Sequence, residues 1–201
     1  MKEPREPLPF WIACGVLRPE LEALAAAGRL TGVRIYLDSM LHMSPPALEV
    51  QLGRVLQDHA LPKDLATQIL VYGDCCPGMQ GLLEGHGARR VDAPNCAQML
   101  LGRARFRELM RERAFLMLPE WTLRWETVFR EELALGPENA RLCMQGLITG
   151  LVYLDTGVMP VPHEELEACG RFLGLPYRVE TVGLEELERA LAAALAPEAG
   201  S

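Results

Sequence analysis

The sequence predicts an α/β fold, a three-layer sandwich in which helices cover both faces of a mostly parallel sheet. Short apolar runs rich in Val, Ile, Leu and Tyr alternate along the chain with longer amphipathic stretches. Most of these runs end at a small or polar residue, and proline or asparagine opens several of the stretches that follow. Right-handed crossovers would then bring the carboxyl ends of the strands to one edge of the sheet.

The first half of the chain supplies four expected strands, over residues 10–15, 33–37, 69–72 and 90–93. Helices are expected over residues 19–27, 45–59, 77–84 and 96–112. Pro19 and the Ser44-Pro45-Pro46 segment indicate helix starts, because the fixed φ of proline suits the first helical turn. Asn95 is suited to cap the helix that begins at residue 96, with a break expected at Gly102.

The second half repeats the alternation, with strands expected over residues 114–118, 151–154 and 177–181. Helices are expected over residues 121–135, 138–147, 162–173 and 184–195. One internal similarity links the halves: both Tyr36-Leu37-Asp38-Ser39 and Tyr153-Leu154-Asp155-Thr156 end a predicted strand. The sequence therefore suggests two pseudo-repeated, Rossmann-like halves, residues 1–112 and 113–201, packed into the same compact domain.

Composition excludes several classes of function. Acidic residues outnumber basic ones by 27 to 20, which argues against a nucleic-acid partner. No stretch approaches the roughly 20 apolar residues of a membrane span, and the apolar run near the N-terminus is too short for a signal peptide. We therefore expect a cytoplasmic protein, in which the six cysteines serve as metal ligands, catalytic thiols or core residues rather than disulfides.

Three cysteines carry the strongest chemical signal. Cys14, Cys75 and Cys96 each lie at or just past the end of a predicted strand, and their sulfurs converge if those strands are neighbours. Three thiolates on separate loops can hold zinc or a 4Fe–4S cluster and leave one coordination position open. Cys76 is an alternative ligand to Cys75. The competing interpretation is that these cysteines are small buried apolar residues.

Four further residues are candidates to act on a ligand. Asp38 and Asp155 follow apolar strands, where a carboxylate can orient a ligand, transfer a proton or simply cap a turn. His42 is a candidate acid, base or ligand. Trp121 is a candidate for stacking on a cofactor, although packing of a helix face explains it equally. No GxGxxG or GxxxxGK[ST] motif is present, so a dinucleotide or P-loop site is not predicted.

A set of short motifs in the order of the chain resembles one family. These are Ala13-Cys14-Gly15, Tyr36-Leu37-Asp38 with Leu41-His42, residues 69–75, Asn95-Cys96 with Leu100-Leu101-Gly102, and residues 118–121. Together they resemble the domain of unknown function 1638 family. The chain departs from the family pattern with Asn95 in place of the usual Asp and with Cys76 in place of the usual Gly.

The resemblance implies a cytoplasmic protein whose genes often occur beside those of corrinoid-dependent methyltransferases. It places Cys14, Cys75 and Cys96 at the family's cysteine positions and His42 at its histidine. The expected function is a metal- or iron–sulfur-binding protein of methyl or one-carbon metabolism, acting on a small-molecule substrate or a corrinoid protein.

Two alternatives remain open at this point. One is a metal-free enzyme with Cys96 or Cys75 as nucleophile, activated by His42 or a helix N-terminus. The other is a noncatalytic module that binds a small metabolite or a partner. The oligomeric state is open as well, a homo-oligomer included.

Overall fold

The computed structural model describes residues 8–58 and 67–196, and over these residues it confirms the α/β class. Strands form two parallel sheets, each in its own compact unit. The first unit holds the described residues up to Cys96 together with those from Glu188 onward, and the second runs from Ala97 to Leu187. In the described part of the chain, no helix has the length and apolar character needed to cross a membrane.

The sheet of the first unit has the order β2-β1-β3-β4, and all its pairs are parallel. The carboxyl ends of neighbouring strands therefore lie at one edge, as predicted. The fourth strand is shorter than expected and earlier in the chain, because only two of its residues pair with β3. The strands are β1 Phe10–Cys14, β2 Val33–Leu37, β3 Gln68–Val71 and β4 Arg89–Arg90.

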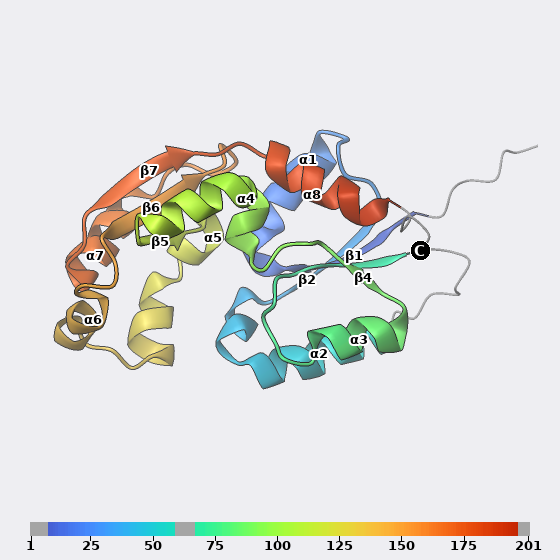
Figure 1. The fold of residues 1–201 in the computed structure, drawn as a ribbon, viewed down its shortest axis with the longest axis horizontal. Helices are drawn as coiled ribbons and strands as arrows, with labels where there is room; N and C mark the ends of the chain where they lie inside the picture. Colours follow the sequence, from blue (N-terminus) through green and yellow to red (C-terminus); the bar gives the residue numbers. More distant parts are fainter. Residues whose placement is uncertain (1–7, 59–66, 197–201) are drawn as a thin grey trace, which may run out of the picture. The chain divides into compact units, whose positions relative to one another are not determined.

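Helices cover both faces of this sheet. Figure 1 shows α1 and α8 above it and α2 and α3 below it. Every residue of β1 is buried, as expected for a central strand covered on both sides. The helices are α1 Arg18–Ala26, α2 Pro45–Asp58, α3 Met79–His86 and α8 Glu185–Leu195, with 3₁₀ turns at Gly15–Leu17 and Ser39–Met43. The predicted end of the second helix, residue 59, lies outside the described residues.

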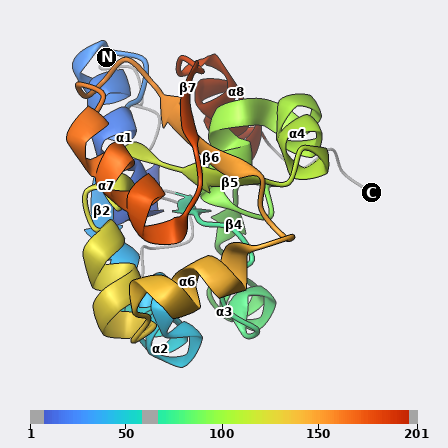
Figure 2. The same ribbon diagram turned by 90° about the vertical axis from the view of Figure 1, so that its left-hand side faces the viewer.

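The sheet of the second unit has the order β5-β6-β7, again parallel. Its strands are β5 Ala114–Met117, β6 Gly150–Asp155 and β7 Tyr177–Thr181, which lie side by side in Figure 2. Leu151 and Tyr153 join a buried cluster with Trp125, Phe129 and Phe172. Val152 and Leu154, which point to the opposite face, are buried too. Both faces of β6 are therefore covered.

The helices of the second unit differ from the prediction in one place. The expected helix over residues 121–135 is instead a short helix α5, Pro119–Thr122, followed by a π-helical segment, Thr127–Glu132. The amide of Leu133 bonds to the carbonyl of Val128, the five-residue spacing of a π turn. Trp125 and Phe129 are both almost fully buried here, so packing has overridden the regular helical repeat. The other helices are α4 Cys96–Arg111, α6 Pro137–Met144 and α7 His163–Leu173.

The break predicted in α4 is confirmed. Gly102 has φ 69° and ψ 167°, which are not helical values, and its φ lies in the range that glycine tolerates best. A Cβ atom there would also lie 2.7 Å from Oε2 of Glu186. Gly102 thus allows the chain to turn where the carboxylate approaches it.

The internal similarity marks a local turn and not equivalent strands. β2 is an edge strand of its sheet, whereas β6 is the central strand of the other. In both, however, the aspartate that ends the strand accepts a hydrogen bond from the amide two residues on: Asp38 from Met40 at 3.0 Å and Asp155 from Gly157 at 2.9 Å. The shared sequence therefore encodes an Asx turn at a strand end.

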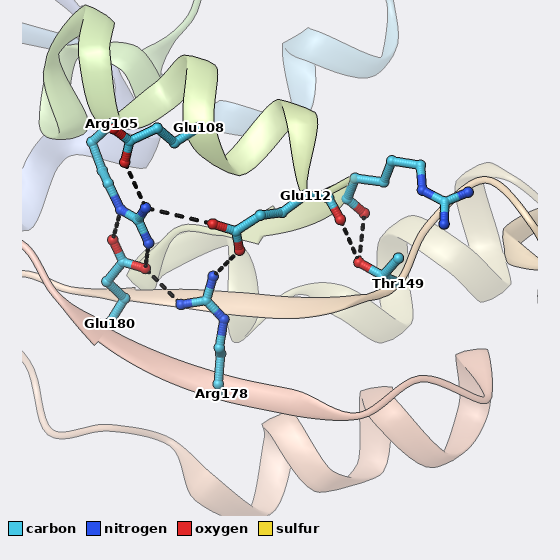
Figure 3. Close-up of polar contacts among 7 residues, drawn as sticks. Arg105, Glu108, Glu112, Thr149, Arg178 and Glu180 are labelled. Carbon is cyan, nitrogen blue, oxygen red and sulfur yellow. Dashed lines mark hydrogen bonds and ion pairs between the residues drawn. The ribbon is translucent and has the colours of Figure 1, made fainter.

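An ion-pair network joins α4 to β7 in the second unit (Figure 3). Arg105 donates to both carboxylate oxygens of Glu180, at 2.6 and 2.8 Å. Arg178 bridges Glu180 and Glu112 at 2.7 and 2.6 Å. The hydrogen bonds to Glu180 and Glu108 raise the pKa of Arg105, and the Arg105 contact lowers the pKa of Glu180. The network fixes the position of α4 on this sheet.

Candidate thiol site

Three cysteines from three separate turns meet at the carboxyl edge of the first sheet. Cys14 is the last residue of β1, Cys75 lies in the turn after β3, and Cys96 is the first residue of α4, after the turn that follows β4. β1 pairs with β3, and β3 pairs with β4, so these turns are neighbours. Cys14 is buried, whereas Cys75 and Cys96 are partly exposed.

The three thiols lie close enough to affect one another's pKa values. Cys96 forms a hydrogen bond with Cys14, and this bond together with burial holds the pKa of Cys96 well above its usual range. Burial, with the neighbouring Cys14, raises the pKa of Cys75 to about 11. The backbone amide of Gly73 donates to the sulfurs of both Cys75 and Cys96 and partly offsets these increases. Without a bound cation, Cys75 and Cys96 are therefore neutral thiols at neutral pH.

A glycine explains how the two cysteine turns come so close. A Cβ atom on Gly73 would lie 2.3 Å from the carbonyl oxygen of Pro94 and 2.5 Å from Cα of Asn95. The amide of Asp74 bonds to the same Pro94 carbonyl at 2.9 Å. The turn that carries Cys75 therefore rests on the turn that leads into Cys96, with no room for a side chain between them.

The structure distinguishes Cys75 from its neighbour. Cys76 is buried and accepts hydrogen bonds from the backbone amides of Met79 and Gly78 at the start of α3, and burial followed by the nearby Glu49 raises its pKa. Cys75, in contrast, interacts with both Cys14 and Cys96. Of the two adjacent cysteines, Cys75 is thus the one in the group.

Tyr72 belongs to the same site, although the sequence reasoning did not single it out. Its hydroxyl donates to the carbonyl of Ala13 at 3.3 Å, and its side chain is almost fully buried. Burial raises the pKa of Tyr72, and Cys14, Cys96 and Cys75 act in the same direction. The sequence does contain a signal for Tyr72. It is the last residue of the apolar run 69–72, directly before the Gly73 turn, and the one residue of that run with a polar group on its side chain.

The other candidate residues are spread over both units. Asp38 is exposed and near enough to the Tyr72 hydroxyl to affect its pKa. His42 is exposed on the 3₁₀ turn that follows Asp38. Asp155 and Trp121 belong to the second unit, where Asp155 caps a turn and Trp121 packs against Phe115 and Phe129. Cys143 and Cys169 fall inside helical patterns of the sequence, which predicts core positions for both. Cys169 is buried as predicted, whereas Cys143 is exposed, so the prediction for Cys143 is wrong.

The donor set fits a soft metal ion or an iron–sulfur cluster, since thiolates are the ligands that zinc and such clusters prefer. Among the described residues, no three His, Cys, Asp or Glu side chains are arranged to hold an ion as they stand. In the structure, Cys14 and Cys96 hydrogen-bond each other through their thiol protons. A shared ion would replace those protons and require the sulfurs to turn to one point.

The family model "Protein of unknown function (DUF1638)" matches residues 36–191. The chain belongs to this family. The match includes Cys75, Cys76 and Cys96 as well as Asp38 and His42, and it begins after Cys14. No match was found among curated proteins or among solved structures. The resemblance predicted from the sequence motifs is thereby confirmed, and the roles of the residues stay predictions.

Proposed function

We propose that Cys14, Cys75 and Cys96 bind a zinc ion or a 4Fe–4S cluster, and that this DUF1638 protein serves methyl or one-carbon metabolism. The observation that carries the metal proposal is the meeting of three thiols from three turns of one parallel sheet. The metabolic role, with a corrinoid protein or a small molecule as partner, is supported only by the family resemblance.

A bound metal or cluster would supply a Lewis-acidic or redox-active centre with one position free of protein ligands. Around it, the residues of the chain have separate tasks. The amide of Gly73 donates to two of the sulfurs and stabilises their thiolate forms. The Tyr72 hydroxyl lies near the thiols and donates to the backbone carbonyl of Ala13 in β1. Asp38 and His42, which lie in the same unit as the thiols, are proposed to act on a ligand beyond the metal.

The test is elemental analysis and a visible spectrum of protein purified without oxygen. We expect stoichiometric zinc, or iron with sulfide. Cys14→Ala, Cys75→Ala and Cys96→Ala should each lose most of the metal, because removing one of three thiolates leaves an incomplete site. Asp38→Asn and His42→Ala should keep it and change ligand affinity or turnover only.

Two cysteines of the same chain serve as controls. Cys76→Ala tests the neighbouring thiol, which bonds to the α3 amides, and Cys143→Ala tests an exposed thiol in the second unit. Both should retain the metal content of the parent. If Cys96→Ala binds metal as well as the parent, the three-thiolate site is wrong. A metal-free protein with one reactive thiol would instead identify a cysteine nucleophile. A protein with neither bound metal nor a reactive thiol would be a noncatalytic binding module.

A further inference from the structure

A pocket of about 450 Å³ opens beside the thiols in the first unit. Its volume lies within the range of small-molecule sites in proteins. Cys75 belongs both to the pocket lining and to the three thiols, so a molecule in the pocket lies next to this partly exposed cysteine. The remaining lining residues are apolar or polar side chains from three segments: Pro45, Asp74, Cys76, Pro77, Met79, Gln80 and Arg90.

Among the described residues that line the pocket, Arg90 is the only basic one. Its side chain is 20 % exposed, and Nη1 lies 2.7 Å from Oδ1 of Asp74. That contact is an ion pair without hydrogen-bond alignment, and no described residue accepts a hydrogen bond from Nη1, although the atom is buried. A buried guanidinium N–H without an aligned acceptor is uncommon and calls for an explanation.

The partner of Arg90 is easily displaced. The Asp74 side chain is 65 % exposed, so its carboxylate can move into water at little cost, as exposed ion pairs contribute little to stability. Arg90, being mostly buried, stays in place on β4. An incoming anion can therefore take the position of the Asp74 carboxylate and align with the planar guanidinium.

We propose that this pocket binds a small molecule that carries a single carboxylate. The carboxylate of this molecule displaces that of Asp74 and binds the guanidinium of Arg90. A monoanion fits because the lining holds one guanidinium, which already faces the Asp74 carboxylate, and because a second carboxylate, Glu49, lies at the neighbouring turn, where it accepts from the Gly78 amide at 3.2 Å. The carboxylates of Asp74 and Glu49 would repel a doubly charged phosphate more strongly than the single Arg90 guanidinium attracts it. Pro45, Pro77 and Met79 offer apolar surface to the rest of the molecule.

The interpretation of this pocket as a substrate site rests on the proposed function, because Cys75 would bind the metal or cluster next to it. The binding of the carboxylate itself depends only on Arg90 and the shape of the pocket. The two proposals can therefore fail separately.

The experiment titrates the full-length protein with butanoate, butanamide and inorganic phosphate, followed by calorimetry or by NMR of the amides around the pocket. Butanoate should bind saturably and butanamide should not. Arg90→Gln should weaken butanoate binding about tenfold or more, since a hydrogen bond to a charged group is lost. Asp74→Asn should strengthen it about threefold, because the competing carboxylate is gone.

Arg89→Gln is the matched control, since Arg89 precedes Arg90 on β4 but donates to the carbonyl of Ala196 at 2.9 Å. Its butanoate affinity should equal that of the parent. The proposal would be overturned if the parent protein showed no saturable binding of butanoate, or if Arg90→Gln bound butanoate as tightly as the parent. Tighter binding of butanamide or phosphate than of butanoate would overturn it as well. If Arg90→Gln does not fold, the butanoate affinity of Asp74→Asn tests the proposal, and an affinity no higher than that of the parent overturns it. Butanoate binding by Cys96→Ala without metal separates this proposal from the metal site.

Discussion

At the scale of single residues, the thiol site depends on a backbone contact as much as on the cysteines. A Cβ atom on Gly73 would overlap the carbonyl oxygen of Pro94, which belongs to the backbone and cannot move aside without separating the two turns. Gly73→Ala should therefore destabilise the first unit by about 1–3 kcal/mol and lower metal content together with it. Urea unfolding and elemental analysis measure both.

Gly81→Ala is the control for this change, because a Cβ atom on Gly81 of helix α3 would meet nothing within 4 Å. Alanine is the better helix former, so this variant should keep the parent stability or gain up to about 1 kcal/mol. If Gly73→Ala unfolds at the same urea concentration as the parent, the close contact of the turns does not hold the site.

The residue scale also shows where sequence reasoning stops. The meeting of Cys14, Cys75 and Cys96 could be predicted, because the alternation of apolar runs with helical stretches indicates a parallel sheet. Each of these cysteines lies at or just past the end of one of its strands. The choice between Cys75 and Cys76 could not be predicted, because adjacent side chains in a turn point in different directions that only the backbone torsions decide. Arg90 was missed for a related reason, since its role comes from burial beside a pocket.

At the scale of elements, the strands and most helices were predictable, and the exception is instructive. The aromatic spacing of Trp121, Trp125 and Phe129 resembles one face of a regular helix. The structure instead uses a short helix and a π segment, since Trp125 and Phe129 both enter the cluster under β6. A spacing of four residues fits either solution, and the tertiary packing decides between them.

The contact between α4 and β7 gives a prediction of pH dependence. Arg105 and then Arg178 lower the pKa of Glu180 below its ordinary value of 4.5 in the folded unit. The unfolded chain then binds more protons than the folded one as the pH falls, so this contribution is present above about pH 4.5 and is lost as the pH falls through the folded pKa.

Glu180→Gln should therefore lower stability by about 1 kcal/mol at pH 7, and the difference from the parent should shrink in acid. Urea unfolding of both proteins at pH 7 and at about pH 3.5 measures it. The exposed Glu132, changed to Gln, should show no comparable difference at either pH. A Glu180→Gln effect that stays constant down to acid would show that the side chain acts through packing and not through charge.

At the scale of the whole molecule, the described residues form two parallel sheets with different strand orders, β2-β1-β3-β4 and β5-β6-β7. The alternation of strands and helices predicted parallel pairing but not this order, because order depends on which strands meet and not on their composition. The return of the chain to its first unit could not be predicted either. Helix α8 begins in the second unit, and from Glu188 onward it belongs to the first.

This return makes the first unit depend on the last helix of the chain. Glu188 pairs with Arg29 just after α1, Arg89 of β4 bonds to the carbonyl of Ala196, and Leu191 is 3 % exposed. Leu191→Ala should therefore destabilise the first unit by about 2–5 kcal/mol and expose its β1 amides to hydrogen exchange. Leu195→Ala, on the same helix but 42 % exposed, should stay within about 0.5 kcal/mol of the parent. Unchanged protection of β1 in Leu191→Ala would mean that the first sheet folds without this helix, and the thiol site would then need only the residues up to Cys96.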